Sequence, residues 1–588
     1  MKRLLAAVSL GALSACASLN TGPQPTAMDQ RFTAIYEAEW AWRNSAGPTE
    51  GDESAQEDEN PKTWARVDPA WQAERLAYLT GVMTRLDALN PAAMSPAERV
   101  NLSIYRYQIG VVISRIKFRD YEKPLNADST FWTNAASSAP KAFRTTEEAE
   151  HWVARLNDLP RYFDDQVANM KLGAARGFTP PRATLEGRDK SITAVYENKT
   201  PEQSSFYEPF RTLPASIPAD KQAELRAAAS KAIADKVFPA YKKLLGYYRD
   251  EYYPLTTTNL AATSLPDGAA YYQAQIHEFT TLDKTPDEIH QIGLAEVAKI
   301  RARMEEQMKL SGFKGTFPDF LKFLRTDPQF YPKTGEELLM RGAWISKKFD
   351  GKAERYFGRL PRSRFDVIPV PDDIAPFYTA GRGGTGVYLL NTYNLPSRAL
   401  YSLPALTLHE SAPGHAFQMP LAEEQEGMPK FRRYTYISAF GEGWALYCEL
   451  LGEEMGMYQT PYEVFGMLSY QMWRASRLVV DTGIHAKGWT REQAQKFMHD
   501  NTALADHEIT TEVDRYISWP GQALSYYLGE MAIIEARKKA EAALGAKFDL
   551  RHFHDTVLQL GSVPLPVLAD RIDQWIADGG PDPYAASK

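Results

Sequence analysis

The sequence predicts a large, mainly α-helical protein with a small antiparallel β-sheet next to the helix that carries most of the candidate active-site residues. Apolar residues recur at steps of three and four along most of the 588 residues, which is the spacing of one helical face. Only the stretch between residues 365 and 391 changes to a strand pattern. No unit repeats at a fixed period, so a solenoid is not expected. The hydrophobic fraction of 44% and the charged fraction of 24% are those of a folded globular protein.

Charge and cysteine content exclude several classes of protein. The formal net charge is −7 and no long Lys/Arg run occurs, so the chain offers little attraction to nucleic acid or to an anionic membrane surface. The two cysteines, Cys16 and Cys448, are too few for a disulfide scaffold, a Cys-rich zinc module or an iron–sulfur cluster. We therefore expect no nucleic-acid partner, and any chemistry must come from His, Asp, Glu, Tyr and Arg side chains.

The N-terminus has the features of a targeting segment. Residues 1–15 combine a positively charged start with a short apolar stretch, and Leu-Ser-Ala-Cys at 13–16 resembles a bacterial lipobox, in which the signal is cut before a lipidated Cys. Cys16 would then begin a polar tether over residues 16–29, and no later stretch is apolar enough to span a bilayer. Ala17 does not resemble the Asp that retains lipoproteins in the inner membrane, so we expect an outer-membrane anchor facing the periplasm. The alternative is a secreted protein with an incidental Cys.

Two helical parts follow the tether, residues 30–255 and residues 256–588, which we expect to form one continuous body. Apolar residues at helical spacing in the first part are Leu76, Leu79, Val82, Met83, Leu86, Leu89, Leu102, Tyr105, Ile109, Val112 and Ile113. Long Ala/Glu/Lys-rich runs predict helices over 219–253 and 285–309. The second of these begins with Thr-Pro-Asp-Glu, which has the cap chemistry of a helix start.

Two strand-like segments predict the small sheet. Residues 365–370 and 386–391 are rich in β-branched and aromatic residues, and a Gly-rich turn at 378–385 lies between them. We expect the two strands to pair antiparallel. They lead into residues 406–418, where two His and a Glu occur close together.

His409, Glu410 and His415 are the centre of this segment. In His-Glu-x-x-His zinc sites, two imidazoles four residues apart share a helical face and the Glu takes a proton from metal-bound water. His409 and His415 are six apart, which on a straight helix would place them about 240° apart around the axis. Pro413 and Gly414 could redirect His415, because Pro disfavours helix at the preceding residue. The alternative is a pair of helix-terminal histidines that cap backbone groups.

A third ligand is expected from a second helix. Glu442 follows His415 by 27 residues and lies between Gly441 and Gly443, whose lack of side chains would allow close approach to another helix. Glu449 lies two turns further along the same face, where its carboxylate could accept a hydrogen bond from the ring nitrogen of a ligating His that faces away from the metal. The alternative for Glu442 is an ordinary surface or salt-bridged residue.

Four motifs together resemble a known family. They are His-Glu-x-x-Pro-Gly-His-x-x-Gln at 409–418, Glu-Gly-Trp-Ala-Leu-Tyr at 442–447, Arg-Leu-Val-Val-Asp-Thr-Gly-Ile-His at 477–485 and Pro-Gly-Gln-Ala-Leu-Ser-Tyr at 520–526. The combination resembles the bacterial family catalogued as domain of unknown function 885, whose members are predicted zincin-like metallopeptidases and often lipoproteins. The resemblance covers residues 30–580. It implies a mostly helical, zincin-like fold, one Zn²⁺ ion and a peptide substrate.

With this resemblance, roles can be assigned to the central residues. His409, His415 and Glu442 are the expected zinc ligands, and Glu410 is the expected general base for the metal-bound water. The expected donors to the oxyanion of the reaction are His485, Tyr516 and Tyr526. Asp481 precedes His485 by one helical turn and could orient its imidazole, although without the resemblance an ordinary intrahelical row of charges fits equally well.

A further group of residues is expected to bind substrate: Arg477, Arg515, Tyr388, Asn391 and Gln522. The two arginines could each bind a substrate carboxylate, which would favour exopeptidase or short-peptide cleavage. The strand at 386–391 could pair with an extended peptide by strand addition. Two other functions stay open, a hydrolase of non-peptide amides such as a cell-wall amidase, and a non-catalytic lipoprotein scaffold. The presence of Glu410 beside both His residues argues against the scaffold, because a binding module needs no base.

Overall fold

The computed structural model describes residues 25–47, 60–127, 129–372, 375–425, 427–433 and 435–585, and it confirms the mainly α-helical fold. The expected signal peptide and Cys16 lie outside the described residues. Among the helices that are described, none combines the length and the apolar character needed to cross a membrane.

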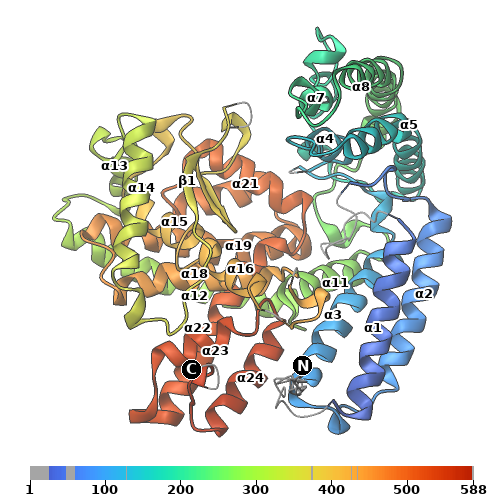
Figure 1. The fold of residues 1–588 in the computed structure, drawn as a ribbon. Coiled ribbons are helices and arrows are strands. Elements are labelled where there is room, and N and C mark those ends of the chain that lie inside the picture. The colour runs from blue at the N-terminus through green and yellow to red at the C-terminus, as the bar shows by residue number, and fades with distance from the viewer. Residues whose placement is uncertain are drawn as a thin grey trace, which may run out of the picture.

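Three long helices stand side by side at the N-terminal end of the molecule (Figure 1). They are α1 (Ala27–Ser45), α2 (Pro69–Asp87) and α3 (Pro96–Phe118). The prediction of a tether up to residue 29 is wrong at its end, because α1 begins at Ala27. The Thr26 hydroxyl accepts the Asp29 N–H and the Asp29 side chain accepts the Thr26 N–H, so this capping box fixes the helix start.

A helical arm follows, at the upper right of Figure 1. It contains α4 (Phe131–Ser137), α5 (Thr146–Ala175), α6 (Asp189–Thr193), α7 (Glu208–Arg211), α8 (Ala219–Ala232), α9 (Phe238–Tyr247) and α10 (Tyr253–Leu255). The helix predicted over 219–253 is present as α8 to α10, joined through two π-helical turns. The arm has its own core, in which Trp132, Trp152 and Tyr241 are fully buried.

The rest of the chain forms the larger body. Its first helices are α11 (Gly268–Thr280), α12 (Pro286–Leu310), α13 (Phe317–Thr326) and α14 (Gly335–Asp350). After the sheet come α15 (Leu403–Glu410), α16 (His415–Glu423), α17 (Lys430–Arg433), α18 (Ser438–Glu454), α19 (Pro461–Lys487), α20 (Arg491–Asn501), α21 (Asp506–Ser518), α22 (Ser525–Leu544), α23 (Leu550–Leu558) and α24 (Leu565–Ala577). The helix predicted over 285–309 is α12, and Thr285 caps it as expected.

The small sheet is mixed, which corrects the expected antiparallel pairing. Its strands are β1 (Asp366–Pro369), β2 (Gly381–Gly384) and β3 (Val387–Leu390), in the order β1-β3-β2. The two predicted strands, β1 and β3, run parallel, and the Gly-rich segment expected as a turn supplies the antiparallel strand β2. The reason is that a tight turn at Gly386, with φ of +80°, joins β2 directly to β3, so the hairpin forms between these two.

The hydrophobic cores do not follow the expected boundary at residue 255. Phe32 and Leu102 from α1 and α3 share one core with Trp444, Phe553 and Trp575 from α18, α23 and α24. A second, larger core joins the sheet to α11, α12, α15, α19, α21 and α22. The N-terminal helices therefore pack as part of the larger body, and α15 and α18 lie where these two cores meet.

Candidate metal centre

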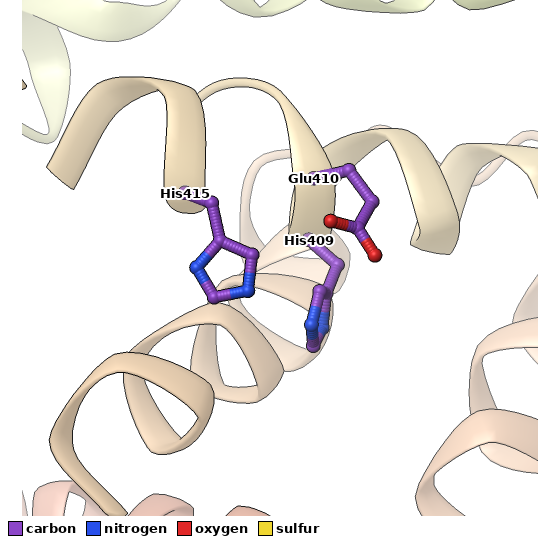
Figure 2. Close-up of side chains that lie close together, drawn as sticks. All are labelled: His409, Glu410 and His415. Atoms are coloured by element: carbon purple, nitrogen blue, oxygen red, sulfur yellow. The ribbon is translucent and has the colours of Figure 1, made fainter. Parts of the chain in front are cut away.

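A break in the helix brings His409 and His415 together. Helix α15 ends at Glu410 and α16 begins at His415, so the two His come from the adjoining ends of two helices (Figure 2). The expected redirection at Pro413 and Gly414 is present, and the two imidazole centroids are 5.0 Å apart. A Cβ on Gly414 would lie 1.8 Å from the His409 carbonyl oxygen, so the turn requires glycine.

Glu442 on α18 faces both histidines. Its Oε2 lies 3.4 Å from His409 Nε2 and 3.5 Å from His415 Nε2. Two ligands that each lie about 2.0–2.2 Å from one tetrahedral ion are about 3.3–3.6 Å apart, so the observed distances fit a shared ion. Two imidazoles and a carboxylate are also a donor set that suits zinc. The three residues therefore fit the metal that the sequence suggests.

Glu449 and Glu442 set the charge around His409. The His409 Nδ1 lies 2.8 Å from the Glu449 Oε1, so Nδ1–H donates to this fully buried carboxylate, and Nε2 faces Glu442. Burial by itself lowers the pKa of His409, but hydrogen bonds to Glu442 and Glu449 raise that pKa to about 10. The surroundings of this imidazole therefore favour a positive charge.

Glu410 lies beside the ligands and is held by the sheet. Its Oε2 accepts the N–H of Gly383 on β2 at 2.7 Å. One of its oxygens and a nitrogen of each His also lie within 4.8 Å of one another, so two carboxylates flank the His pair (Figure 2). Glu442 is the better ligand of the two, because one oxygen faces both Nε2 atoms while the Glu410 carboxylate is bound by β2.

The two glycines around Glu442 have different neighbours. A Cβ on Gly443 would lie 2.4 Å from the backbone of Gly529 on α22, which confirms the expected close approach to another helix. A Cβ on Gly441 would lie 2.4 Å from the ring of Tyr436, so this glycine makes room for a side chain instead. The Tyr436 hydroxyl donates to Glu442 Oε1 at 3.0 Å. We did not predict Tyr436, although its position six residues before Glu442 and the small Gly441 were visible signals.

His485 is not an oxyanion donor in this structure, and Asp481 does not orient it. The His485 Nδ1 accepts the Ala262 N–H at 3.0 Å, and Nε2 donates to the Tyr516 carbonyl oxygen at 2.9 Å. Asp481 instead accepts the Tyr272 hydroxyl at 2.6 Å. Burial lowers the pKa of His485 to about 4, which keeps the ring neutral. These contacts correct our prediction, since both ring nitrogens are satisfied by the backbone.

Tyr516 and Arg477 also belong to the interior. The Tyr516 hydroxyl accepts from Trp473 Nε1 and Arg477 Nε and donates to Glu512, all at 2.8–2.9 Å. Arg477 pairs with Glu512 at 2.9 Å and is only 2% exposed, so it presents no cation to a substrate. The ring of Tyr526 lies 4.4 Å from the Arg477 guanidinium. Three donors were expected, His485, Tyr516 and Tyr526. The polar ring or hydroxyl atoms of the first two are hydrogen-bonded, whereas the Tyr526 hydroxyl has no hydrogen bond to the described residues.

The remaining predicted substrate residues are also bound within the protein. Arg515 Nη2 donates to Gln522 Oε1 at 3.0 Å. The Tyr388 side chain is fully buried, and Asn391 Nδ2 donates to the carbonyl oxygens of residues 375, 378 and 379. Because β3 is the central strand, it has no free edge for a peptide, which corrects the expected strand addition at 386–391.

Fold and site together define a mainly helical protein with a largely buried His-His-Glu cluster at the junction of two helices. The chain belongs to the bacterial protein family of unknown function DUF885, which matches residues 49–572. No curated protein matches the chain.

The solved structures that are similar to this chain include two candidate lipoproteins. A candidate lipoprotein from Colwellia psychrerythraea is 26% identical with a TM-score of 0.85, and the match covers 94% of this chain and 100% of that one. A candidate lipoprotein of unknown function from Shewanella oneidensis is 17% identical with a TM-score of 0.67, over 92% of this chain and 99% of that one. The second likeness concerns the fold alone.

Proposed function

We propose that this protein is a zinc-dependent hydrolase of the cell envelope that cleaves short peptides. The observation that carries the proposal is the convergence of His409, His415 and Glu442, in which one carboxylate oxygen lies 3.4 and 3.5 Å from two imidazole nitrogens. These residues would hold Zn²⁺. When bound, the ion would polarise the scissile carbonyl and lower the pKa of water to about 7.

Glu410 is the general base in this proposal. It follows a ligand directly in the chain, and the Gly383 N–H holds its Oε2 at 2.7 Å. This contact orients the carboxylate and leaves Oε1 to accept the proton of the attacking water. The same carboxyl group would then donate that proton to the leaving amine. Glu449 would hold the proton on Nδ1 of His409, so that Nε2 is the nitrogen that binds the ion.

The peptide would pair with β2 and not with β3. The Asn391 N–H donates to the Ala380 carbonyl at 2.9 Å, so in the antiparallel pattern the main-chain groups of Gly381 and Gly383 point away from β3. The Gly383 N–H accordingly reaches Glu410. A substrate strand along this edge would pair with the main-chain groups of Gly381 and with the Gly383 carbonyl, and it would pass next to the base.

The envelope location rests on the N-terminus and on the relatives. Cys16 lies in a lipobox-like sequence, and the similar structure from Colwellia psychrerythraea is a candidate lipoprotein. We propose that Cys16 carries the lipid and that the protein faces the periplasm from the outer membrane.

A comparison of wild type with Glu410→Gln tests the catalytic proposal. Purified protein is analysed for zinc and incubated with a diverse peptide library. Glu410→Gln should keep zinc and lose about 10²–10⁴-fold in kcat, because the general base is removed. His415→Ala should lose the metal together with the activity. Glu423→Gln, which changes a carboxylate on α16 that binds Thr385, is the matched control.

Two outcomes would overturn the proposal. One is a wild-type protein that holds stoichiometric zinc and cleaves no peptide in the library. The other is wild-type turnover by Glu410→Gln.

A further inference from the structure

The accessible side of the cluster is bordered by Glu410, which is partly exposed, and by Glu442. The Glu442 side chain is 15% exposed, whereas the side chains of His409 and His415 are 3% and 8% exposed. The Glu442 Oε2 faces the histidines, and its Oε1 faces Tyr436. A substrate carbonyl that approaches the cluster therefore arrives near Tyr436.

Tyr436 is held firmly at this position. Its hydroxyl donates to Glu442 Oε1 at 3.0 Å, and its ring fills the space above the Cα of Gly441. The ring also meets the His415 imidazole edge to face, with centroids 6.4 Å apart. The phenol hydrogen thus lies at the ligand cluster.

The other predicted donors are less suited to the reaction. His485 and Tyr516 have their polar atoms bound inside the protein. The Tyr526 hydroxyl is free among the described residues, but it makes no hydrogen bond to a proposed ligand. Tyr436 alone of these four donates directly to one.

We propose that the Tyr436 hydroxyl is the hydrogen-bond donor that stabilises the oxyanion of the hydrolytic reaction. This inference rests on the proposed peptidase function. The oxygen of water forms a bond to the carbonyl carbon, its proton passes to Glu410, and the π electron pair moves onto the carbonyl oxygen. The phenol keeps its proton, and its hydrogen bond moves from Glu442 Oε1 to the new oxyanion. When the carbon–nitrogen bond breaks, the carbonyl re-forms and Glu410 protonates the amine.

Tyr436→Phe tests this role, because it removes the donor and keeps the ring. We expect zinc content to be unchanged and kcat to fall by about 10²–10³-fold, the usual loss for one oxyanion donor. KM should change by less than about threefold, because the donor acts in the transition state. Affinity for a phosphinic peptide, which mimics the tetrahedral state, should fall with kcat, while affinity for a reduced-amide peptide should not. Binding of both inhibitors is measured by calorimetry on the zinc-loaded protein.

Tyr356→Phe is the matched control, since its hydroxyl donates to the Glu454 carbonyl at the far end of α18. It should retain wild-type kcat and phosphinic-peptide affinity. The inference is overturned if Tyr436→Phe keeps kcat within about threefold of wild type. It is also overturned if the variant loses zinc, because Tyr436 would then act through Glu442. If the zinc-loaded wild type cleaves no peptide, the proposed peptidase function is contradicted, and the role of Tyr436 is contradicted together with it.

Discussion

At the residue scale, Gly383 illustrates how closely the sheet and the candidate base are joined. A Cβ at this position would lie 1.6 Å from the Glu410 carbonyl oxygen, so β2 and the end of α15 are in backbone contact. The same residue donates its N–H to Glu410 Oε2. The orientation of the base therefore depends on the absence of a side chain on the neighbouring strand.

Gly383→Ala should separate β2 from α15 and break the hydrogen bond to Glu410. We expect a loss of stability of about 1–3 kcal/mol, typical of overpacking, together with a fall in kcat at unchanged zinc content. Gly384→Ala is the control, because a Cβ there meets no atom within 4 Å. Thermal melting, zinc analysis and peptide turnover of the two variants check this. Equal behaviour of the two variants would contradict the role of the contact.

At this scale the sequence predicts which residues lie close together better than it predicts their hydrogen-bond partners. The Pro-Gly turn between His409 and His415 was predictable, because six-residue spacing cannot place two ligands on one side of a straight helix. The fate of His485 was not, since its partners are backbone groups of residues 262 and 516 that only the folded chain brings near. A lone histidine in a motif shows its chemistry but not whether its nitrogens are already bonded.

At the scale of elements, Asp481 connects three segments. It lies on α19, accepts the hydroxyl of Tyr272 on α11, and accepts the N–H of Gly521 before α22. Burial raises the pKa of Asp481 from 3.8 to about 7, although its hydrogen bonds to Tyr272 and Gly521 oppose that rise. The folded protein therefore binds this proton more tightly than the unfolded chain does.

This difference predicts a pH dependence of stability. The contribution of Asp481 is full below about pH 4, the pKa of an unfolded Asp, and is lost as pH rises through 7. Asp481→Asn cannot titrate, so its melting temperature should fall less than that of wild type between pH 5 and pH 8. Melting curves across this range check the prediction, with the exposed Asp578→Asn as control. A wild-type slope in Asp481→Asn would show that another group titrates.

The sequence predicts helices better than strand pairing. Apolar spacing and cap residues located α12 within one residue of its observed limits, because both signals are local. The pairing of β1 with β3 was not visible in the two strands themselves, because β2 forms the hairpin with β3 through the turn at Gly386 and β1 pairs with the other edge of β3. β2 was missed because its sequence, Gly-Arg-Gly-Gly, has no strand propensity and forms through its neighbour.

At the scale of the whole molecule, the N-terminal helices are tied to the C-terminal ones. Arg432 on α17 donates to Asn101 on α3 and to the Leu560 carbonyl after α23. The core around Phe32 and Trp444 spans the same elements. The shared core fits the expectation of one continuous body, but the expected division at residue 255 does not follow it, because a core shared by distant segments leaves no local mark in a sequence.

Cys16→Ser should release the protein from membranes into the soluble fraction. In the proposed lipoprotein the lipid on Cys16 is the anchor, and the substitution removes the thiol that carries it. Cys448→Ser is the control, because this thiol is buried in α18 and should have no effect on fractionation. Immunoblots of membrane pellet and supernatant measure the distribution. Persistence of Cys16→Ser in the pellet would contradict lipid anchoring.

The turn between α15 and α16 has a consequence for protein engineering. In a His-Glu-x-x-His helix the separation of the two imidazoles is fixed by helical pitch, and an inserted residue rotates the second ligand by about 100°. Here the separation depends on four turn residues, 411–414, between two helix ends. Turn length and the residues at 411–413 are therefore adjustable, while Gly414 is not, and designed variants of the turn would alter the preference for the proposed metal without rebuilding either helix.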